Sequence, residues 1–280
     1  MLAPPDGFIL VPGPARVTAT AAVFGVALDG RASAGAAGAT GRSPASHGPL
    51  VCKRLGSRAA AEPWVRARLS AEGELLKRLG GAATPRLVAA GEDGHGPFIV
   101  MDRVAGAPLS ARLGGAASGW ITKATRATFA ALDRLHEAGV VHADLSPDNV
   151  FCSPDAGVAT LLDLGLAVYA GAPPMPVGPF RGTPAYAAPE LVRGEPFDAR
   201  ADLFALAATL LHVASGSRPR PAQSEAAVLL SAGENDVTPW ARAAARGLDA
   251  ATARALLACC AFEARCRPPS AHAVTVSLDL

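Results

Sequence analysis

The stretch HADLSPDNVF, residues 142–151, concentrates reactive groups in a chain that is otherwise poor in polar side chains. It holds a histidine, two carboxylates and an asparagine within eight positions, around a proline. A carboxylate can accept a proton, and carboxylate and amide oxygens bind hard cations such as Mg²⁺. Proline, aspartate and asparagine also favour turns, so this stretch alone fits an ordinary turn equally well. The elements around it must decide between the two.

Composition predicts a globular chain with room for one large domain or two lobes. Of its 280 residues half are hydrophobic and 18% are charged, and the net charge is +2. These values argue against intrinsic disorder and against a nucleic-acid binder held by a strong basic field. No apolar run reaches the roughly 18 residues that span a bilayer, and the start lacks the basic leader of a signal peptide. We therefore expect a cytoplasmic protein with no membrane segment and no nucleic-acid partner.

The five cysteines are odd in number and scattered, as expected of reduced thiols. Cys259, Cys260, Cys266 and His272 raise the alternative of a zinc site, but they lack the C-x-x-C pairs usual in structural zinc sites. Residues 252–261, ARALLACCAF, have helical character, and cysteines in helices serve as small core residues. We expect a helix there rather than a metal site.

The first hundred residues read as strands around one helix. Apolar or alternating runs predict strands over 16–28, 49–55 and 97–104. Residues 62–79 place leucines beside charged residues and end at two glycines, which predicts an amphipathic helix. The Gly-, Ala- and Ser-rich segment 30–48 is too poor in bulky side chains to pack, so we expect a loop between two strands.

Beyond residue 108 the pattern changes to helices. Residues 122–138 have an apolar side and stop at a glycine, and residues 199–215 are apolar all round, which is typical of a helix in the centre of a domain. The sequence thus predicts three parts: a strand-rich region at 1–101, a connector at 102–107 and a helical region at 108–280.

Seven motifs in order extend the pattern beyond residues 142–151. HADLSPDNV spaces Asp144 and Asn149 as D-x-x-x-x-N, and Asp163-Leu164-Gly165 follows fourteen residues after Asn149. The others are Lys53 closing V-C-K, Glu72 in the predicted helix, GTPAYAAPE at 182–190, Asp202 in the buried helix, and Arg267 in RCRPPSA. Over residues 16–275 this order resembles that of bacterial, eukaryotic-like Ser/Thr protein kinases. The resemblance implies an α+β, two-lobe fold with a small β-rich N-lobe, a hinge and a larger α-helical C-lobe.

The resemblance also implies ATP and Mg²⁺ (or Mn²⁺) as cofactors, with a role for each polar motif. Asn149 and Asp163 would bind the metal, and Asp144 would accept the proton of the substrate hydroxyl. Lys53 would bind the α and β phosphates, oriented by Glu72. Taken singly, these residues are more often strand-end charges, exposed carboxylates or turn formers. Their joint order and spacing carry the interpretation.

Further residues follow from the same resemblance. Met101 stands at the gatekeeper position, and the backbone from Asp102 to Val104 would offer C=O and N–H groups to adenine. Glu190 and Arg267 would form an ion pair that braces the substrate-docking segment against the distant helices.

Three departures from the family pattern predict a kinase of modest activity. Residues 20–25, TAAVFG, keep only the last glycine of the phosphate loop G-x-G-x-x-G, so Thr20, Ala22 and Gly25 are the candidate phosphate contacts there, with fewer close N–H groups. Ser146 replaces a lysine that usually touches the γ-phosphate, and Ala143 replaces the arginine of H-R-D. The lost charges would slow transfer, because charge stabilisation supplies most of the catalysis.

These departures leave three functions open. Phosphoryl transfer to Ser or Thr of a protein is favoured, because the lysine, the glutamate, the base and both metal ligands are present. A pseudokinase that binds a partner or senses ATP is the main alternative. A small-molecule phosphotransferase of similar fold is the third, but it has no need of a peptide-docking segment such as GTPAYAAPE. The expected partners are a protein substrate and a regulatory protein.

Overall fold

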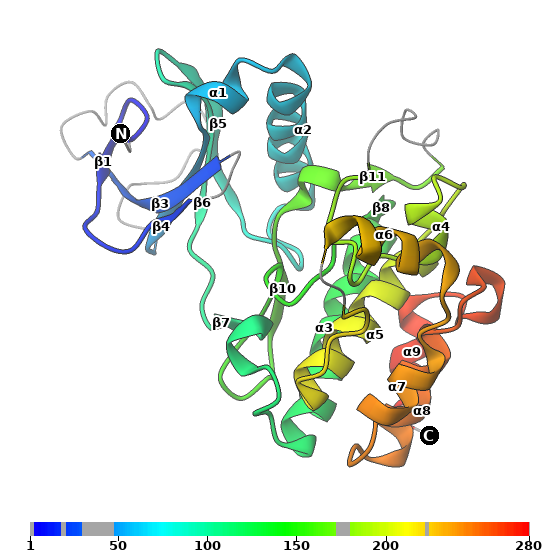
Figure 1. The fold of residues 1–280 in the computed structure, drawn as a ribbon. Helices are drawn as coiled ribbons and strands as arrows, with labels where there is room; N and C mark the ends of the chain where they lie inside the picture. The colour runs from blue at the N-terminus through cyan, green and yellow to red at the C-terminus, as the bar shows by residue number, and fades with distance from the viewer. Residues whose placement is uncertain (1–2, 18–20, 30–47, 172–179, 222–223, 280) are drawn as a thin grey trace. The chain divides into compact units, whose positions relative to one another are not determined.

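The computed structural model of the protein describes residues 3–17, 21–29, 48–171, 180–221 and 224–279. The chain forms two compact units, Met1–Val104 and Ala105–Leu280 (Figure 1). The first is built on a β-sheet and the second is largely helical, so the α+β class predicted from the sequence is confirmed. The predicted loop at 30–48 lies outside the described residues except for Gly48.

An antiparallel sheet of six strands forms the first unit, in the order β1-β3-β4-β6-β5 with β2 beside β3. Its strands are β1 (Phe8–Leu10), β2 (Arg16–Val17), β3 (Ala21–Leu28), β4 (Leu50–Leu55), β5 (Leu87–Asp93) and β6 (Gly96–Asp102). The run 16–28, predicted as one strand, is two strands that pair with each other, Val17 opposite Ala22.

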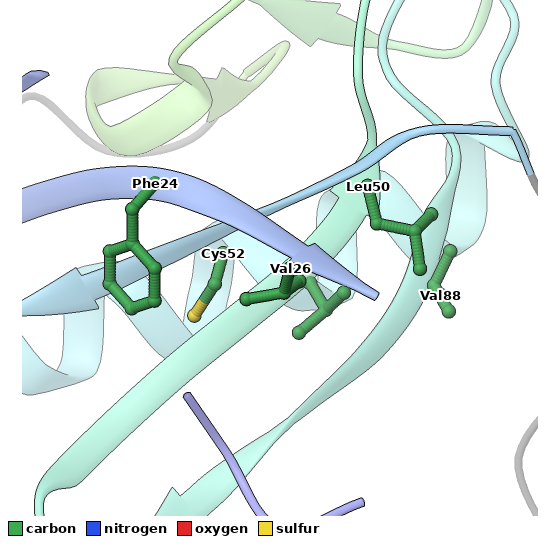
Figure 2. Close-up of a cluster of buried hydrophobic side chains, with 6 residues drawn as sticks. Phe24, Val26, Leu50, Cys52 and Val88 are labelled. Atoms are coloured by element: carbon green, nitrogen blue, oxygen red, sulfur yellow. The ribbon is translucent and has the colours of Figure 1, made fainter. Parts of the chain in front are cut away.

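The two faces of this sheet have different roles. Phe24, Cys52 and Val100 lie opposite one another on neighbouring strands and belong to one buried cluster. Figure 2 labels Phe24 and Cys52 among its members. Side chains alternate between the faces along a strand, so Lys53, one residue from Cys52, lies on the other face, opposite Ile99. The first face therefore builds a core, and the charged side chain of Lys53 lies on the second face.

Helix α2 (Pro63–Leu79) packs on the face that carries Lys53. It begins with a proline in its first turn and ends at Gly80, whose φ of 60° is left-handed, as glycine readily allows. Its buried stripe includes Leu69, Leu76 and, among them, Glu72. The short helix α1 (Ser57–Ala60) precedes it. The predicted amphipathic helix over 62–79 is thus confirmed within one residue.

Close contact between α2 and the sheet depends on Gly73. A Cβ added there would lie 3.3 Å from the Cβ of Ala90 and 3.7 Å from Ile99. We expect Gly73→Leu to push α2 off the sheet and lower the free energy of unfolding by about 1–3 kcal/mol, the usual cost of overpacking. Gly119→Leu is the matched control, because Gly119 is also helical but has no atom within 4 Å of an added Cβ. Urea titrations that give both variants the same stability would contradict this prediction.

The second unit consists mostly of helices around one buried central helix. Its elements are β7 (Ala107–Pro108), η3 (Leu109–Arg112), α3 (Ser118–Glu137), β8 (Val140–Val141), β9 (Val150–Cys152), β10 (Ala159–Leu161), η4 (Leu164–Leu166), β11 (Val168–Tyr169), α4 (Pro189–Val192), α5 (Arg200–Ser215), α6 (Glu225–Glu234), α7 (Thr238–Ala244), α8 (Ala250–Cys259), η5 (Ala264–Cys266) and α9 (Ala271–Ser277). Helix α5 is buried at every residue from Ala201 to Val213 and packs against α3, α7 and α8. Its all-round apolar sequence predicted this central position.

The C-terminal cysteines are placed as a helix predicts. Cys259 and Cys260 lie at the end of α8 and are buried, whereas Cys266 is exposed. Within the described ranges no three His, Cys, Asp or Glu side chains are grouped so that they could hold a metal ion. In the same part of the chain, no helix is both long enough and apolar enough to cross a bilayer.

Candidate active site

In the second unit, residues 142–149 form a loop between two short strands. Strand β8 before the loop pairs with β11, and β9 after it pairs with β10 and β7. The loop is joined to the residue before Asp163 by two hydrogen bonds. The N–H of Leu162 donates to the carbonyl of Asn149 at 2.8 Å, and the ring Nε2 of His142 donates to the carbonyl of Leu162 at 2.9 Å. This pairing brings the two metal-ligand candidates onto adjoining segments.

The central helix α5 fixes the backbone of the loop through Asp202, a carboxylate with no solvent exposure. Its Oδ2 accepts from the N–H of His142 at 2.7 Å, and its Oδ1 accepts from the N–H of Ala143 at 2.8 Å. His136 of α3 adds a third contact, Nε2 to Oδ2 at 2.9 Å. Ala143 has a left-handed φ of 62°, which is strained for a residue with a Cβ. Asp202 therefore binds the loop at the point where its backbone is strained.

Asp144 is held on both sides of its carboxylate. Its Oδ1 accepts from both the N–H and the hydroxyl of Thr183, each at 2.9 Å, and its Oδ2 lies 3.4 Å from the amide nitrogen of Asn149. Burial raises the pKa of Asp144 and the nearby charge of Asp163 raises it further, while the hydrogen bonds from Thr183 and the nearby His142 oppose the shift. The carboxylate is thus half-buried, oriented and hydrogen-bonded to a hydroxyl.

Asn149 and Asp163 fit a hard cation by the chemistry of their atoms. The amide nitrogen of Asn149 donates to the backbone carbonyl of Asp144 at 2.9 Å, which leaves its side-chain oxygen as the possible ligand atom. Asp163 has a left-handed φ of 62° at the start of η4, and its Oδ1 accepts from Gly165 at 3.3 Å. Two oxygen donors on segments joined through Leu162 suit Mg²⁺ or Mn²⁺ better than a soft metal.

In the first unit, half-buried Lys53 and buried Glu72 form an ion pair. The Nζ of Lys53 lies 2.7 and 2.9 Å from the two carboxylate oxygens of Glu72, and only 3% of the glutamate side chain is exposed. The strand places the lysine and α2 places the glutamate, because Gly73 allows the helix to approach the sheet. The pair presents an oriented ammonium group, the kind of donor that binds phosphate.

Two of the three candidate phosphate contacts, Ala22 and Gly25, lie in the described part of the chain. Ala22 and Gly25 both lie inside strand β3, and Thr20 lies outside the described residues. Ala22 packs against the buried cluster of Phe24, on the face opposite Lys53, so its side chain does not point toward the lysine. Gly25, opposite Val51, lies on the Lys53 face. Residues 21–25, the described part of TAAVFG, therefore lie within strand β3.

At the end of the first unit, Met101 is buried on β6, on the same face as Lys53. The N–H of Asp102 donates to the carbonyl of Arg86 at 3.0 Å, and the N–H of Arg103 donates to Pro49 at 2.7 Å. Both N–H groups are therefore used inside the sheet. Among the described residues the N–H of Val104 makes no hydrogen bond, so of the three it is the one available to a ligand.

Comparison with known proteins identifies the family. The model of the protein kinase domain matches residues 39–262. The chain belongs to the protein kinase family. The match includes Lys53, Glu72 and the whole of loop 142–149, so the bacterial, eukaryotic-like kinase resemblance seen in the sequence is confirmed.

Several bacterial Ser/Thr kinases are similar to this kinase domain over part of their length. The DNA damage-responsive serine/threonine-protein kinase RqkA of Deinococcus radiodurans is 39% identical over 141 residues, 48% of this chain and 21% of that protein. Serine/threonine-protein kinase Pkn1 of Myxococcus xanthus is 37% identical over 141 residues, which are 48% of this chain and 20% of that protein. Serine/threonine-protein kinase PknL of Mycobacterium tuberculosis is 31% identical over 175 residues, which are 61% of this chain and 44% of that protein. The chain thus spans less than half the length of these relatives.

Two polar contacts of the kinase domain were not predicted from the sequence. The expected ion pair of Glu190 and Arg267 is present, with both guanidinium Nη atoms on the carboxylate at 2.6 and 2.9 Å. In addition, His136 contacts Asp202, and Arg220 binds the backbone of GTPAYAAPE, residues 182–190. Arg220 belongs to the run S-R-P-R after α5, which has the composition of an exposed turn. Only the burial of its side chain distinguishes Arg220 from an arginine in an exposed turn.

Proposed function

We propose that this chain is an ATP-dependent kinase that phosphorylates serine or threonine in a protein substrate. The observation that carries the proposal is the contact between Asp144 and Thr183. A threonine hydroxyl donates to the Asp144 carboxylate at 2.9 Å, within the range that a general base needs. A substrate hydroxyl bound in this way would be deprotonated by the same carboxylate.

In this proposal each predicted residue has one task. Asp144 orients the substrate hydroxyl and takes its proton, while Lys53, oriented by Glu72, binds the α and β phosphates. Asn149 and Asp163 bind the metal. When bound, Mg²⁺ or Mn²⁺ neutralises phosphate charge. The nucleotide contacts assigned to backbone or apolar groups are Met101, Asp102, Val104, Gly25 and Thr20; Ala22 keeps only a backbone role.

The remaining parts of the proposal concern organisation and partners. Residues 1–101 serve as the N-lobe, 102–107 as the hinge and 108–280 as the C-lobe. The kinase is cytoplasmic, acts on a protein, is controlled by a regulatory protein and binds no nucleic acid. The absence of an H-R-D arginine makes it a non-RD kinase of modest activity.

A pseudokinase is the second candidate, and two observations favour it. Ser146 brings no charge and is 3% exposed, and the side chain of Ala22 faces away from Lys53. Incubation with labelled ATP, Mg²⁺ or Mn²⁺ and a basic protein decides between the two. Phosphoserine or phosphothreonine supports the kinase, and ATP binding without transfer supports the pseudokinase. Phosphotyrosine as the sole product would contradict the interpretation of GTPAYAAPE.

Metal-dependent nucleotide binding is the first prediction of the proposal. ATP with Mg²⁺ should raise the melting temperature of the parent protein, because a ligand at 100 times its Kd stabilises the folded state by about 2.7 kcal/mol. Asp163→Ala should remove most of this shift, and so should EDTA. Asp155→Ala is the control, since Asp155 is an exposed hairpin carboxylate that accepts from Ser153 and Gly157. A parent protein that shows no shift would exclude both the kinase and the ATP-sensing pseudokinase.

The second prediction is that activity does not depend on phosphorylation of the activation segment, the stretch from Asp163 to Glu190. Between Asp163 and Glu190 the chain has no serine, and its one threonine, Thr183, donates its hydroxyl to Asp144. Ala143 also removes the arginine that usually receives the activating phosphate. We expect phosphatase treatment to leave the transfer rate within about twofold. A large fall in rate, with a phosphosite mapped between Gly165 and Gly182, would show that this account of regulation is wrong.

A further inference from the structure

Arg220 is a buried arginine that binds three backbone carbonyls of one short segment. It follows the end of α5, and only 3% of it is exposed. Its Nη1 donates to the carbonyls of Pro184, Ala185 and Ala187 at 3.3, 3.1 and 2.9 Å. All three carbonyls belong to GTPAYAAPE, the segment that carries Thr183 at one end and Glu190 at the other.

The charge of Arg220 has no carboxylate partner among the described residues. Glu190, the carboxylate in the same segment, has both oxygens bound by Arg267. Arg220 instead lies over the ring of Phe204, 5.3 Å from its centroid, and Arg267 lies over the same ring at 4.9 Å. Burial lowers the pKa of Arg220 to about 10, so the side chain remains charged at neutral pH. Its Nη1 therefore faces carbonyl dipoles and its guanidinium lies over a ring, while its Nε and Nη2 make no hydrogen bond to the described residues.

This arrangement makes the segment and the arginine depend on each other. If residues 184–187 moved away, a buried charge would lose its acceptors, which is far more costly than losing a neutral contact. The pair of Glu190 and Arg267 fixes only the C-terminal end of the segment. Arg220 fixes its middle, immediately after the residue that contacts Asp144.

We infer that Arg220 is a positioning residue for the protein substrate: it holds the backbone of 184–188 in the shape that docks the substrate chain beside Asp144. The inference rests on the proposed function, since it assigns this segment to substrate docking. It requires no contact of Arg220 with ATP, so its loss should weaken use of the protein substrate and leave use of the nucleotide unchanged.

Arg220→Met and Arg220→Lys test the inference in the full chain. Methionine fills a similar volume without charge, and such replacements of buried charges often fold well. We expect Arg220→Met to raise KM for a basic protein substrate about tenfold, the equivalent of one lost hydrogen bond to a charged group. KM for ATP and the slow hydrolysis of ATP without protein substrate should stay unchanged. Lysine, which retains the charge and N–H donors, should restore part of the substrate affinity.

Hydrogen exchange supplies a readout that does not need activity. Amides of residues 185–188 should exchange faster in Arg220→Met than in the parent, while those of α8 should not change. Arg112→Met is the matched control, because Arg112 stacks on Trp120 and makes no hydrogen bond to the docking segment. A parent protein that transfers no phosphate would refute the proposed function, and the exchange measurement would still decide the positioning role. Unchanged exchange at 185–188, or a fall in kcat with an unchanged substrate KM, would overturn the inference.

Discussion

Replacement of Asp144 by asparagine is expected to reduce phosphoryl transfer about 10²- to 10⁴-fold, the usual contribution of a general base. Asparagine has the same shape, and its side-chain oxygen can still accept from the N–H and hydroxyl of Thr183, which now bind Oδ1. It cannot take the proton of a substrate hydroxyl. The measurement is the initial rate of labelling of a basic protein, with ATP binding followed separately by thermal shift.

The control for this loss is Asp148→Asn. Asp148 lies in the same loop, is exposed and accepts from Ser110 at 2.9 Å. Its variant should transfer phosphate at close to the parent rate. An Asp144→Asn protein with the parent rate would mean that another group takes the proton, and the assignment of the loop would then be wrong. Loss of ATP binding as well would indicate a structural role for this carboxylate instead.

The parts of the site that were predicted from the sequence share one property: each depends on the residues of one short stretch of the chain. Asp144 and Asn149 lie on one loop, so their spacing alone limits how far apart they can be. The helical positions of Glu72 and Asp202 were readable because leucines or apolar residues surround each of them at helical spacing. For the same reason the two long helices that carry these carboxylates were predicted close to their observed ends.

The parts that were missed depend on contacts between distant segments or on the phase of a strand. TAAVFG contains only small and apolar residues, which fit a tight turn and a buried strand equally well. The pairing of Val17 with Ala22 shows that Ala22 lies in a strand. Arg220 was missed because its carbonyl acceptors lie more than thirty residues earlier in the chain. An arginine in a Ser-Arg-Pro-Arg run otherwise indicates an exposed turn. Likewise, the internal use of the Asp102 N–H depends on Arg86.

The second large effect is expected from replacing Asp202, on the central helix α5. Asp202→Ala is expected to lower the free energy of unfolding by about 2–6 kcal/mol. The N–H groups of His142 and Ala143 would lose their acceptor in a buried site, and each such loss costs roughly 1–3 kcal/mol. Ala143 would also be released from its left-handed conformation, so Asp144, the next residue, should lose its orientation. Urea unfolding followed by circular dichroism measures the first effect, and the transfer rate measures the second.

Asp198→Ala separates this loss from the ordinary cost of removing an aspartate near a helix start. Asp198 is exposed and accepts from the N–H of Arg200 at 2.8 Å, so its loss should cost only about 1 kcal/mol, as for a typical helix cap. Asp198 lies two residues before α5 and Asp202 lies in its first turn, but only Asp202 reaches loop 142–149. Equal destabilisation by the two variants would show that the loop holds its conformation without Asp202. A much larger loss from Asp202→Ala, together with a fall in transfer, would show that the buried helix holds the loop in the shape that catalysis needs.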